Sequence, residues 1–287
     1  MKSFVKFLFL SLFLLLSCQY TIAGSKYVVA NVSVAPVREK PSHAAEQATQ
    51  LLLGELCEVV DRASGWIKIR STVDGQVGWV TSSMLTSTKK LSSNSPVAVV
   101  VTPTAIARPV DGGAPILLTM GTRLFNYSLG TFSVLSKQYH IDPTCVNIPT
   151  GKADLQRSAL MSIAKSLLNT PYLWGGKSAM GLDCSGFTQV VYAAVGINIL
   201  RNAREQITQG KEVASLADAL PGDLAFFDHS DRDPKATNIS HVGMLISPTQ
   251  IIHCAGGCVH IDRIDANGIY RSDGKRSHHL VKIKRYL

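Results

Sequence analysis

The sequence predicts an α+β protein in which two small β-barrels precede a C-terminal domain of helices packed on an antiparallel sheet. Short apolar runs separated by turn residues recur over residues 28–85 and again over 97–149, a pattern typical of small barrels. From residue 154 the apolar residues instead recur with a period of 3.6, and strand-like runs return only from residue 224. Helices therefore precede the sheet in the last domain.

Length and composition limit the classes of protein to consider. The chain has 287 residues, more than an average domain of about 100 to 200, so two or three folding units are expected. Hydrophobic residues make up 46% and charged residues 17%, which excludes wholesale disorder. A formal net charge of +9 favours an anionic partner such as nucleic acid, acidic lipid or a carboxylate-rich polymer, without choosing among them.

The N-terminus has the pattern of a secretory signal peptide. Lys2 and Lys6 precede an apolar run over residues 8–16, and small or polar residues follow. The run is shorter than the roughly 20 residues that a membrane-spanning helix needs. We therefore expect residues 1–23 to be a signal peptide and the protein to be exported to the periplasm or cell envelope.

Two processing outcomes stay open for this leader. Leu15-Leu16-Ser17-Cys18 resembles the lipobox of bacterial lipoproteins, so lipidation at Cys18 would anchor the protein to a membrane, whereas ordinary cleavage after Ala23 would not. Without Cys18 the cysteine count is odd, so an oxidising compartment leaves at least one thiol unpaired. The remaining cysteines are Cys57, Cys145, Cys184, Cys254 and Cys258.

Residues 24–86 are expected to form the first barrel, residues 87–95 a linker rich in polar residues, and residues 96–150 the second barrel. The first segment resembles a bacterial SH3-like domain, whereas the second is assigned to the same class from its periodicity and position. The resemblance rests on Thr49-Gln-Leu-Leu-Leu-Gly-Glu55, Gly65-Trp-Ile-Lys-Ile69 and Gly78-Trp-Val80.

The C-terminal domain is expected to span residues 151–287. Apolar residues at helical spacing predict one helix after Asp154 and a second helix after Cys184, with Gly196 as its C-terminal cap. The strand-like runs that follow are residues 224–227, 241–246, 251–254, 258–262 and 280–283.

Cys184 and two histidines form the candidate for nucleophilic chemistry. Asp183-Cys184 stands where the second helix begins, and a helix N-terminus lowers a thiol's pKa; the alternative is a core cysteine. His241 and His253 lie on consecutive strands joined by a short turn, so their rings can touch. One could act as base while the other orients it, or both could be unrelated buried histidines.

The C-terminal motifs, in this order, resemble those of NlpC-type cysteine peptidases, papain-like enzymes that cleave bacterial cell-wall peptides. The resemblance covers residues 154–287 and implies a papain-like fold for this domain. It rests on Pro171-Tyr-Leu-Trp-Gly-Gly176, Asp183-Cys-Ser-Gly-Phe187, Arg201 with Gln206, Pro221-Gly-Asp-Leu-Ala-Phe-Phe227, His241-Val-Gly243 and Ile252-His-Cys-Ala-Gly256.

The resemblance implies roles for individual residues. Cys184 would be the nucleophile, His241 the general base and His253 the residue that orients the base. Tyr172 would approach the thiolate and help to form the oxyanion hole. The substrate-contact positions would be Asp183, Ser185, Arg201 and Asn202, although relatives often have Asp-Ser where this chain has Asn202-Ala203, and a salt bridge is the alternative for Arg201.

The function implied is hydrolysis of peptidoglycan stem peptides or muropeptides at the bond between γ-D-glutamate and a diamino acid such as meso-diaminopimelate. We expect a monomer that needs no metal or other cofactor and binds no nucleic acid. In two-barrel relatives the first barrel helps to close the pocket and favours a free N-terminal L-Ala. Those relatives often carry Tyr where this chain has Gln76, which leaves that selectivity open.

Other interpretations remain at this stage. The same cysteine and histidines could serve an amidase or an acyl transferase, or the domain could be inert and the barrels bind the wall. Cys254 and Cys258 lie between His253 and His260 in the sequence, so these four residues could form a zinc site. Alternatively, the two cysteines could form a disulfide across a tight hairpin.

Overall fold

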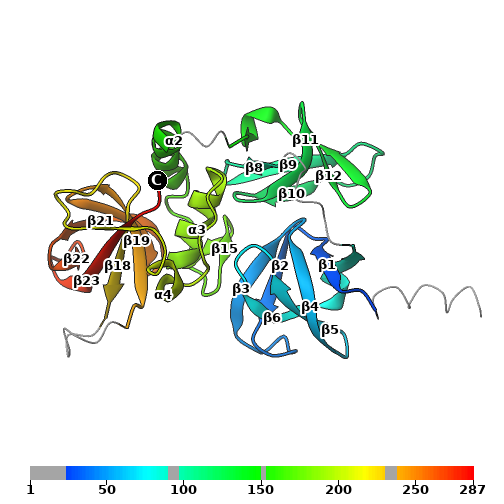
Figure 1. Cartoon of the computed structure of the whole chain (residues 1–287), viewed down its shortest axis with the longest axis horizontal. Helices are drawn as coiled ribbons and strands as arrows, with labels where there is room; N and C mark the ends of the chain where they lie inside the picture. The colour runs from blue at the N-terminus through cyan, green and yellow to red at the C-terminus, as the bar shows by residue number, and fades with distance from the viewer. Residues whose placement is uncertain (1–23, 90–96, 150–152, 230–237) are drawn as a thin grey trace, which may run out of the picture.

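The computed structural model describes residues 24–89, 97–149, 153–229 and 238–287. The predicted signal peptide and Cys18 lie outside these residues. Figure 1 shows two sheets from the N-terminal half of the chain on one side of the helices and the C-terminal sheet on the other. The mixed α+β class is as predicted. Among the described residues, no helix is both long and apolar enough to cross a membrane.

The first sheet is a seven-stranded antiparallel barrel with the strand order β3-β2-β6-β5-β4-β1-β7. Alternate residues point inward, so that Val28, Ala35, Ile67 and Val80 form its core. Its strands are β1 (Tyr27–Ala30), β2 (Val34–Arg38), β3 (Gln47–Leu52), β4 (Leu56–Ala63), β5 (Trp66–Ser71), β6 (Val77–Thr81) and β7 (Leu85–Thr88), with a 3-10 turn at Ser82–Met84.

The second sheet has the order β10-β9-β13-β12-β11-β8-β14, which repeats the first sheet strand for strand. Phe132, Leu118 and Leu124 are fully buried in its core. Its strands are β8 (Val97–Val100), β9 (Thr104–Pro109), β10 (Ile116–Thr119), β11 (Arg123–Ser128), β12 (Thr131–Val134), β13 (Lys137–His140) and β14 (Val146–Asn147), with a 3-10 turn at Pro143–Cys145.

The C-terminal domain is a sheet that closes on itself. Its order is β17-β23-β18-β19-β20-β21-β22, and β22 also pairs with β23, so six strands form a ring with β17 at its edge. The strands are β17 (Lys211–Val213), β18 (Leu224–Asp228), β19 (His241–Ser247), β20 (Gln250–Ala255), β21 (Cys258–Asp265), β22 (Gly268–Tyr270) and β23 (Arg276–Arg285).

Three helices and a short hairpin accompany this sheet. One sheet face packs with helices α2 and α3 in a common core that includes Phe187 and Phe226, while Phe227 and Leu245 on the other face fill the ring interior. The elements are α2 (Ala153–Ser166), α3 (Cys184–Ala194), α4 (Ala203–Gln206), and the hairpin strands β15 (Lys177–Ser178) and β16 (Gly181–Leu182).

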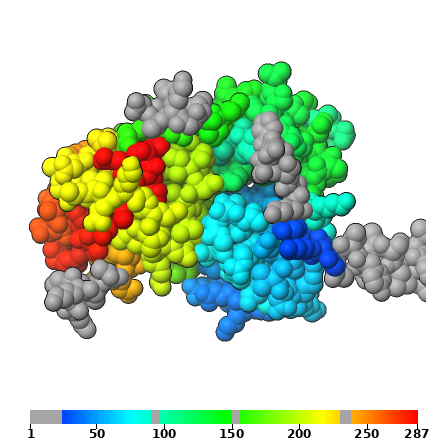
Figure 2. Space-filling view, in the orientation of Figure 1, coloured from blue at the N-terminus to red at the C-terminus, as the bar shows by residue number. Residues whose placement is uncertain are grey.

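Buried polar contacts join the first barrel to the C-terminal domain. The ammonium of Lys177 lies 2.8 Å from Glu55 Oε1, and its backbone N–H donates to Gln50 Oε1 at 2.8 Å. Figure 2 shows the two units in direct contact on this face. Further hydrogen bonds join Thr49 to Arg201 (2.8 Å), Asp74 to Gln189 (3.0 Å), Gln47 to the Trp174 carbonyl (3.1 Å) and Gln76 to Glu205 (3.0 Å).

Breaking the Lys177–Glu55 pair should destabilise the protein. Lys177→Met leaves a buried carboxylate without its counter-ion, which costs about 3–5 kcal/mol, whereas adding Glu55→Gln should recover much of that loss. Urea unfolding measures both. Lys165→Met, at an exposed site on α2, is the control. A loss below about 1 kcal/mol for Lys177→Met would show that the pair does not hold the interface.

Candidate active site

Cys184 is the first residue of helix α3. The preceding residue, Asp183, is the N-cap, and its carboxylate accepts from the Gly186 N–H at 2.6 Å. A Cβ added at Gly186 would lie 2.0 Å from the Gly176 carbonyl oxygen, so the helix start can approach the Gly-Gly loop only because Gly186 has no side chain. The sequence Asp-Cys-Ser-Gly thus fixes both the cap and the approach.

Arg201 is a buried hub behind the cysteine. Its guanidinium donates to both Asp183 oxygens (2.6 and 3.0 Å), to Ser185 Oγ at 3.0 Å, to the Gly176 carbonyl at 3.3 Å and to Thr49 Oγ1 at 2.8 Å. These bonds occupy its five N–H groups, and its side chain is 1% exposed. Arg201 therefore fits the salt-bridge alternative, and the substrate contact implied by the family resemblance is not supported.

Two histidines and an aspartate form a hydrogen-bonded relay on the sheet. His241 Nε2 lies 2.8 Å from His253 Nδ1, and His253 Nε2 lies 3.2 Å from Asp262 Oδ2. Gly243 makes room for this contact, since a Cβ there would lie 2.9 Å from the His253 Cβ. The predicted meeting of His241 and His253 is present, and Asp262 extends it.

The order of the relay determines where its protons lie. Burial alone would raise the pKa of Asp262, but its interactions with His253 and His260 outweigh burial and lower it, so the group is a carboxylate that can only accept. His253 must then donate from Nε2, and its Nδ1 accepts from the Nε2–H of His241. Nδ1 of neutral His241 is thereby left with a free lone pair, which can take a proton.

Burial keeps the two histidines of this relay neutral. It lowers the pKa of His241 well below the usual value, and the neighbouring histidines lower it further. The pKa of His253 is lowered for the same first reason, although Asp262 opposes the shift. The His278 ring stacks on the His241 ring with centroids 4.2 Å apart, and burial lowers the His278 pKa to about 3. A neutral His241 is the form that a general base requires.

The pKa of the Cys184 thiol is raised, whereas the position at a helix N-terminus predicted that it would be lowered. Burial, followed by the Asp183 charge, raises the pKa of Cys184 to about 11; hydrogen bonds from the Val242 and Ser185 N–H groups and the Arg201 charge only partly oppose this. The lowered pKa expected from the sequence is therefore wrong for the resting site, because desolvation outweighs the helix terminus. The thiol needs a base to become nucleophilic.

A cavity of about 900 Å³ opens over these groups. Cys184, His241 and Tyr172 line it together, and Trp174, 61% exposed, stands among its lining residues. Burial and the neighbouring Cys184 and Asp183 raise the pKa of Tyr172 to about 12. The first barrel supplies another part of the lining through Glu39, Glu46, Ala48, Lys68, Gln76, Val77 and Gly78.

Most of the predicted site residues lie on this cavity. Tyr172, Asp183, Cys184, Ser185, Asn202 and His241 line it, whereas His253 and Arg201 stay buried behind the lining. Sequence reasoning missed Asp262 and His278. The alternation of β21 offered a signal for Asp262, because it lies two residues after His260 and so on the same face of the strand.

The five described cysteines are free thiols. Cys254 pairs in register with Val259 rather than Cys258, and its thiol donates to the Leu182 carbonyl at 3.1 Å. The disulfide and the mixed Cys/His zinc site considered from the sequence therefore do not form, because Cys254 points to the sheet face opposite to His253.

The raised thiol pKa predicts a pH dependence. Because thiolate forms only as the pH approaches about 11, the rate constant for alkylation of Cys184 by iodoacetamide should rise about tenfold per pH unit from pH 6 to 9 without a plateau. Mass spectrometry of the Cys184 peptide measures it, and Cys184→Ala gives the background from other thiols. A plateau below pH 8 would indicate a preformed thiolate–imidazolium pair instead.

Comparison with known proteins agrees with this geometry. The NlpC/P60 family matches residues 169–274, and the bacterial dipeptidyl-peptidase SH3 domain matches residues 37–85. A crystal structure of an NlpC/P60 family protein from Bacillus cereus ATCC 10987 superposes with a TM-score of 0.76 and covers 91% of this chain and 99% of that chain at 24% identity, which shows the shared fold. The predicted papain-like domain behind an SH3-like barrel is thus confirmed.

Two similar proteins carry the same name. The γ-D-glutamyl-L-lysine dipeptidyl-peptidase of Bacillus cereus (strain ATCC 10987 / NRS 248) is 32% identical in an alignment of 228 residues. The match covers 71% of this chain and 66% of that protein, just under two thirds of its length. Its counterpart from Bacillus subtilis (strain 168) is 28% identical over 217 residues, 71% of each. Together these matches show that the chain carries a domain of the NlpC/P60 family of cysteine peptidases, with a bacterial dipeptidyl-peptidase SH3 domain ahead of it.

Proposed function

We propose that this protein hydrolyses peptidoglycan stem peptides at the bond between γ-D-glutamate and a diamino acid, with Cys184 as nucleophile and His241 as general base. The observation that carries the proposal is the cavity that Cys184, His241 and Tyr172 share with the first barrel. Similarity to proteins named γ-D-glutamyl-L-lysine dipeptidyl-peptidases supports the choice of bond.

The first step is proton transfer from Cys184 to Nδ1 of His241. A free thiol with a pKa of about 11 is a poor nucleophile at neutral pH, so attack on the substrate carbonyl depends on this transfer. The imidazolium that forms on His241 is hydrogen-bonded to His253, which in turn contacts the Asp262 carboxylate. The relay therefore orients the base and stabilises the charge that develops on it.

Tyr172 and the start of helix α3 supply the donors for the oxyanion. Because its pKa is raised to about 12, the Tyr172 hydroxyl keeps its proton near neutral pH and can donate to the developing negative charge. The N–H of Cys184, in the first turn of α3, is the second donor.

His241 then reverses its role. It gives its proton to the departing amine of the diamino acid, the C–N bond breaks, and the γ-D-glutamyl group remains on Cys184 as a thioester. Water enters, loses a proton to His241 and attacks the thioester, which releases the acid and restores the thiol.

The first barrel selects the substrate in this proposal. It contributes Glu39 and Glu46 to the cavity lining, and carboxylates suit the free amine at the end of a released wall peptide. Gln76 donates to Glu205 beside Asn202, so the barrel also borders the part of the lining where this chain departs from its relatives. A short peptide with a free L-Ala end is the substrate that this arrangement favours.

Two further assignments accompany this proposal. The strand order that β8–β14 share with β1–β7 supports a second SH3-like barrel over residues 96–150. The basic and apolar residues of the leader support export to the cell envelope, where peptidoglycan is found, with Cys18 as the one candidate for lipidation. Secretion of the chain into the envelope fraction, with or without a lipid on Cys18, is the direct test.

Removing the nucleophile or the base should abolish turnover. We expect Cys184→Ala and His241→Ala to lower kcat for a defined muropeptide at least about a thousandfold, because each removes a group needed for the covalent step. Mass analysis of the products should show that the wild type releases L-Ala-D-Glu from a peptide with a free L-Ala end, and the same dipeptide still joined to its sugar from a muropeptide. Release of the sugar from L-Ala would instead indicate an amidase, and full turnover by a folded Cys184→Ala variant would contradict the mechanism.

Filling the barrel side of the cavity should weaken binding of short peptides. Ala48→Phe places a large side chain in the lining, so kcat/KM for a soluble tetrapeptide should fall about tenfold or more, while alkylation of Cys184 keeps its rate. The matched control is Ala44→Phe, at an exposed residue of the same barrel outside the lining. Loss of activity only on insoluble wall would show that the barrel is an anchor alone.

A further inference from the structure

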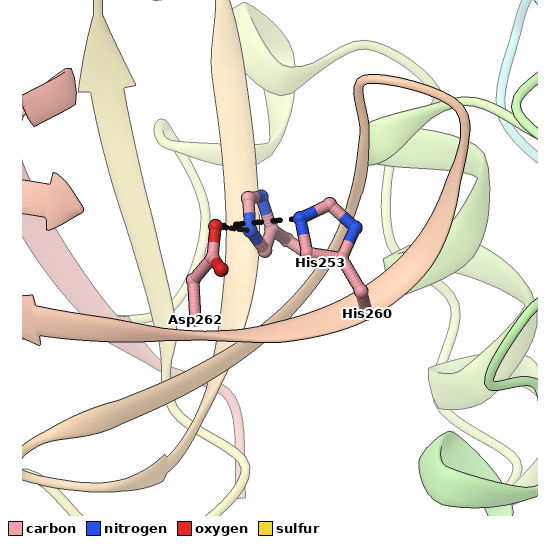
Figure 3. Close-up of side chains that lie close together, drawn as sticks. All are labelled: His253, His260 and Asp262. Atoms are coloured by element: carbon pink, nitrogen blue, oxygen red, sulfur yellow. Dashed lines mark hydrogen bonds and ion pairs between the residues drawn. The ribbon is translucent and has the colours of Figure 1, made fainter. Parts of the chain in front are cut away.

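Three side chains with metal-binding atoms meet on strands β20 and β21, next to the relay. His253 and His260 lie opposite each other in register, and Asp262 follows on the same face. His253 Nε2 and His260 Nε2 lie 3.2 and 3.3 Å from the same Asp262 oxygen, Oδ2, and the three ligand atoms lie within 4.8 Å of one another (Figure 3).

The contact between His260 Nε2 and Asp262 Oδ2 is favourable only if a proton or a metal cation lies between the two atoms. His260 Nδ1 lies 2.8 Å from the Cys258 carbonyl, which can only accept, so Nδ1 carries the proton. In the neutral ring Nε2 then presents a lone pair to the Asp262 carboxylate at 3.3 Å, and two acceptors face each other. Either an extra proton or a metal cation resolves this contact.

We propose that His253, His260 and Asp262 bind a zinc ion that switches the peptidase off. Zinc takes histidine nitrogen and carboxylate oxygen at about 2.0–2.2 Å in a tetrahedron, whose edges are then about 3.3 Å long. The two measured edges, 3.2 and 3.3 Å, have this length. The bond from His260 Nδ1–H to a backbone carbonyl is the support that zinc-binding histidines usually have.

Solvent reaches the site mainly at His260. The His260 side chain is 35% exposed and that of Asp262 15%, whereas His253 is 1% exposed. A zinc ion can therefore approach past His260, with water as its fourth ligand. Cys184 does not take part, because the three ligand atoms all come from β20 and β21.

Zinc would act on His241, the proposed base, through its hydrogen bond with His253. This step rests on the proposed function. Binding to His253 Nε2 displaces the proton that this nitrogen donates to Asp262. His253 then carries its proton on Nδ1 and donates it to His241 Nε2. Because His241 Nε2 must now accept, His241 holds its own proton on Nδ1. Each ring still has one proton, but the nitrogen that should deprotonate Cys184 is occupied. We therefore expect zinc to leave His241 neutral but unable to take the proton of the Cys184 thiol.

Metal binding can be tested without turnover. Cobalt(II), a spectroscopic substitute for zinc, should give tetrahedral d–d absorption with one ion per chain in the full-length Cys184→Ala protein, and zinc should displace it. His260→Gln should weaken this affinity at least tenfold, whereas His140→Gln, an exposed histidine in the second sheet, should leave it unchanged. Absence of binding, or equal binding by His260→Gln, would overturn the site.

Inhibition tests the switch. Zinc should inhibit muropeptide hydrolysis by the otherwise wild-type enzyme, a chelator should restore it, and His260→Gln should raise the inhibitory concentration at least tenfold. Inhibition that is equal in both proteins would place the ion on Cys184 and overturn the switch. If cobalt binds as described but the metal-free enzyme cleaves no wall peptide, the site stands and the proposed function fails.

Discussion

The buried ion pair between Asp183 and Arg201 is the interaction on which the rest of the site depends. Asp183 caps the helix that begins at Cys184, so the position of this thiol follows from the position of that carboxylate. Arg201 holds the carboxylate with two donors and reaches Thr49 of the first barrel with a third. One guanidinium thus joins helix α3 and the barrel that borders the cavity.

A buried ion pair of this kind fixes the positions of its neighbours more than it adds to the free energy of unfolding. Removing two charges from water costs several kcal/mol, and the attraction repays this only when every donor and acceptor is used. Arg201 meets that condition through its contacts with Asp183, Ser185, Gly176 and Thr49. The Asp183 charge also helps to keep the Cys184 thiol protonated. In the proposed mechanism the thiol therefore stays neutral until His241 takes its proton.

The sequence was sufficient to predict the groups that local pattern controls. Helical periodicity behind Asp183-Cys184 located the start of α3, and strand alternation with a short turn brought His241 near His253. Asp262 was missed because its role depends on the register between β20 and β21, which periodicity does not define. The thiol pKa was wrong because it depends on burial by elements distant in sequence. For the same reason, the sequence left the role of Arg201 open.

In the proposed mechanism His241 keeps Nδ1 unprotonated because His253 and Asp262 fix its tautomer. Nitrogen-15 NMR of histidine-labelled protein at neutral pH measures this directly, since protonated and unprotonated ring nitrogens differ strongly in chemical shift. His241 and His253 should both be neutral with the proton on Nε2, and Asp262→Ala should release this preference. A proton on Nδ1 of His241 in the metal-free resting enzyme would show that the relay does not fix the tautomer.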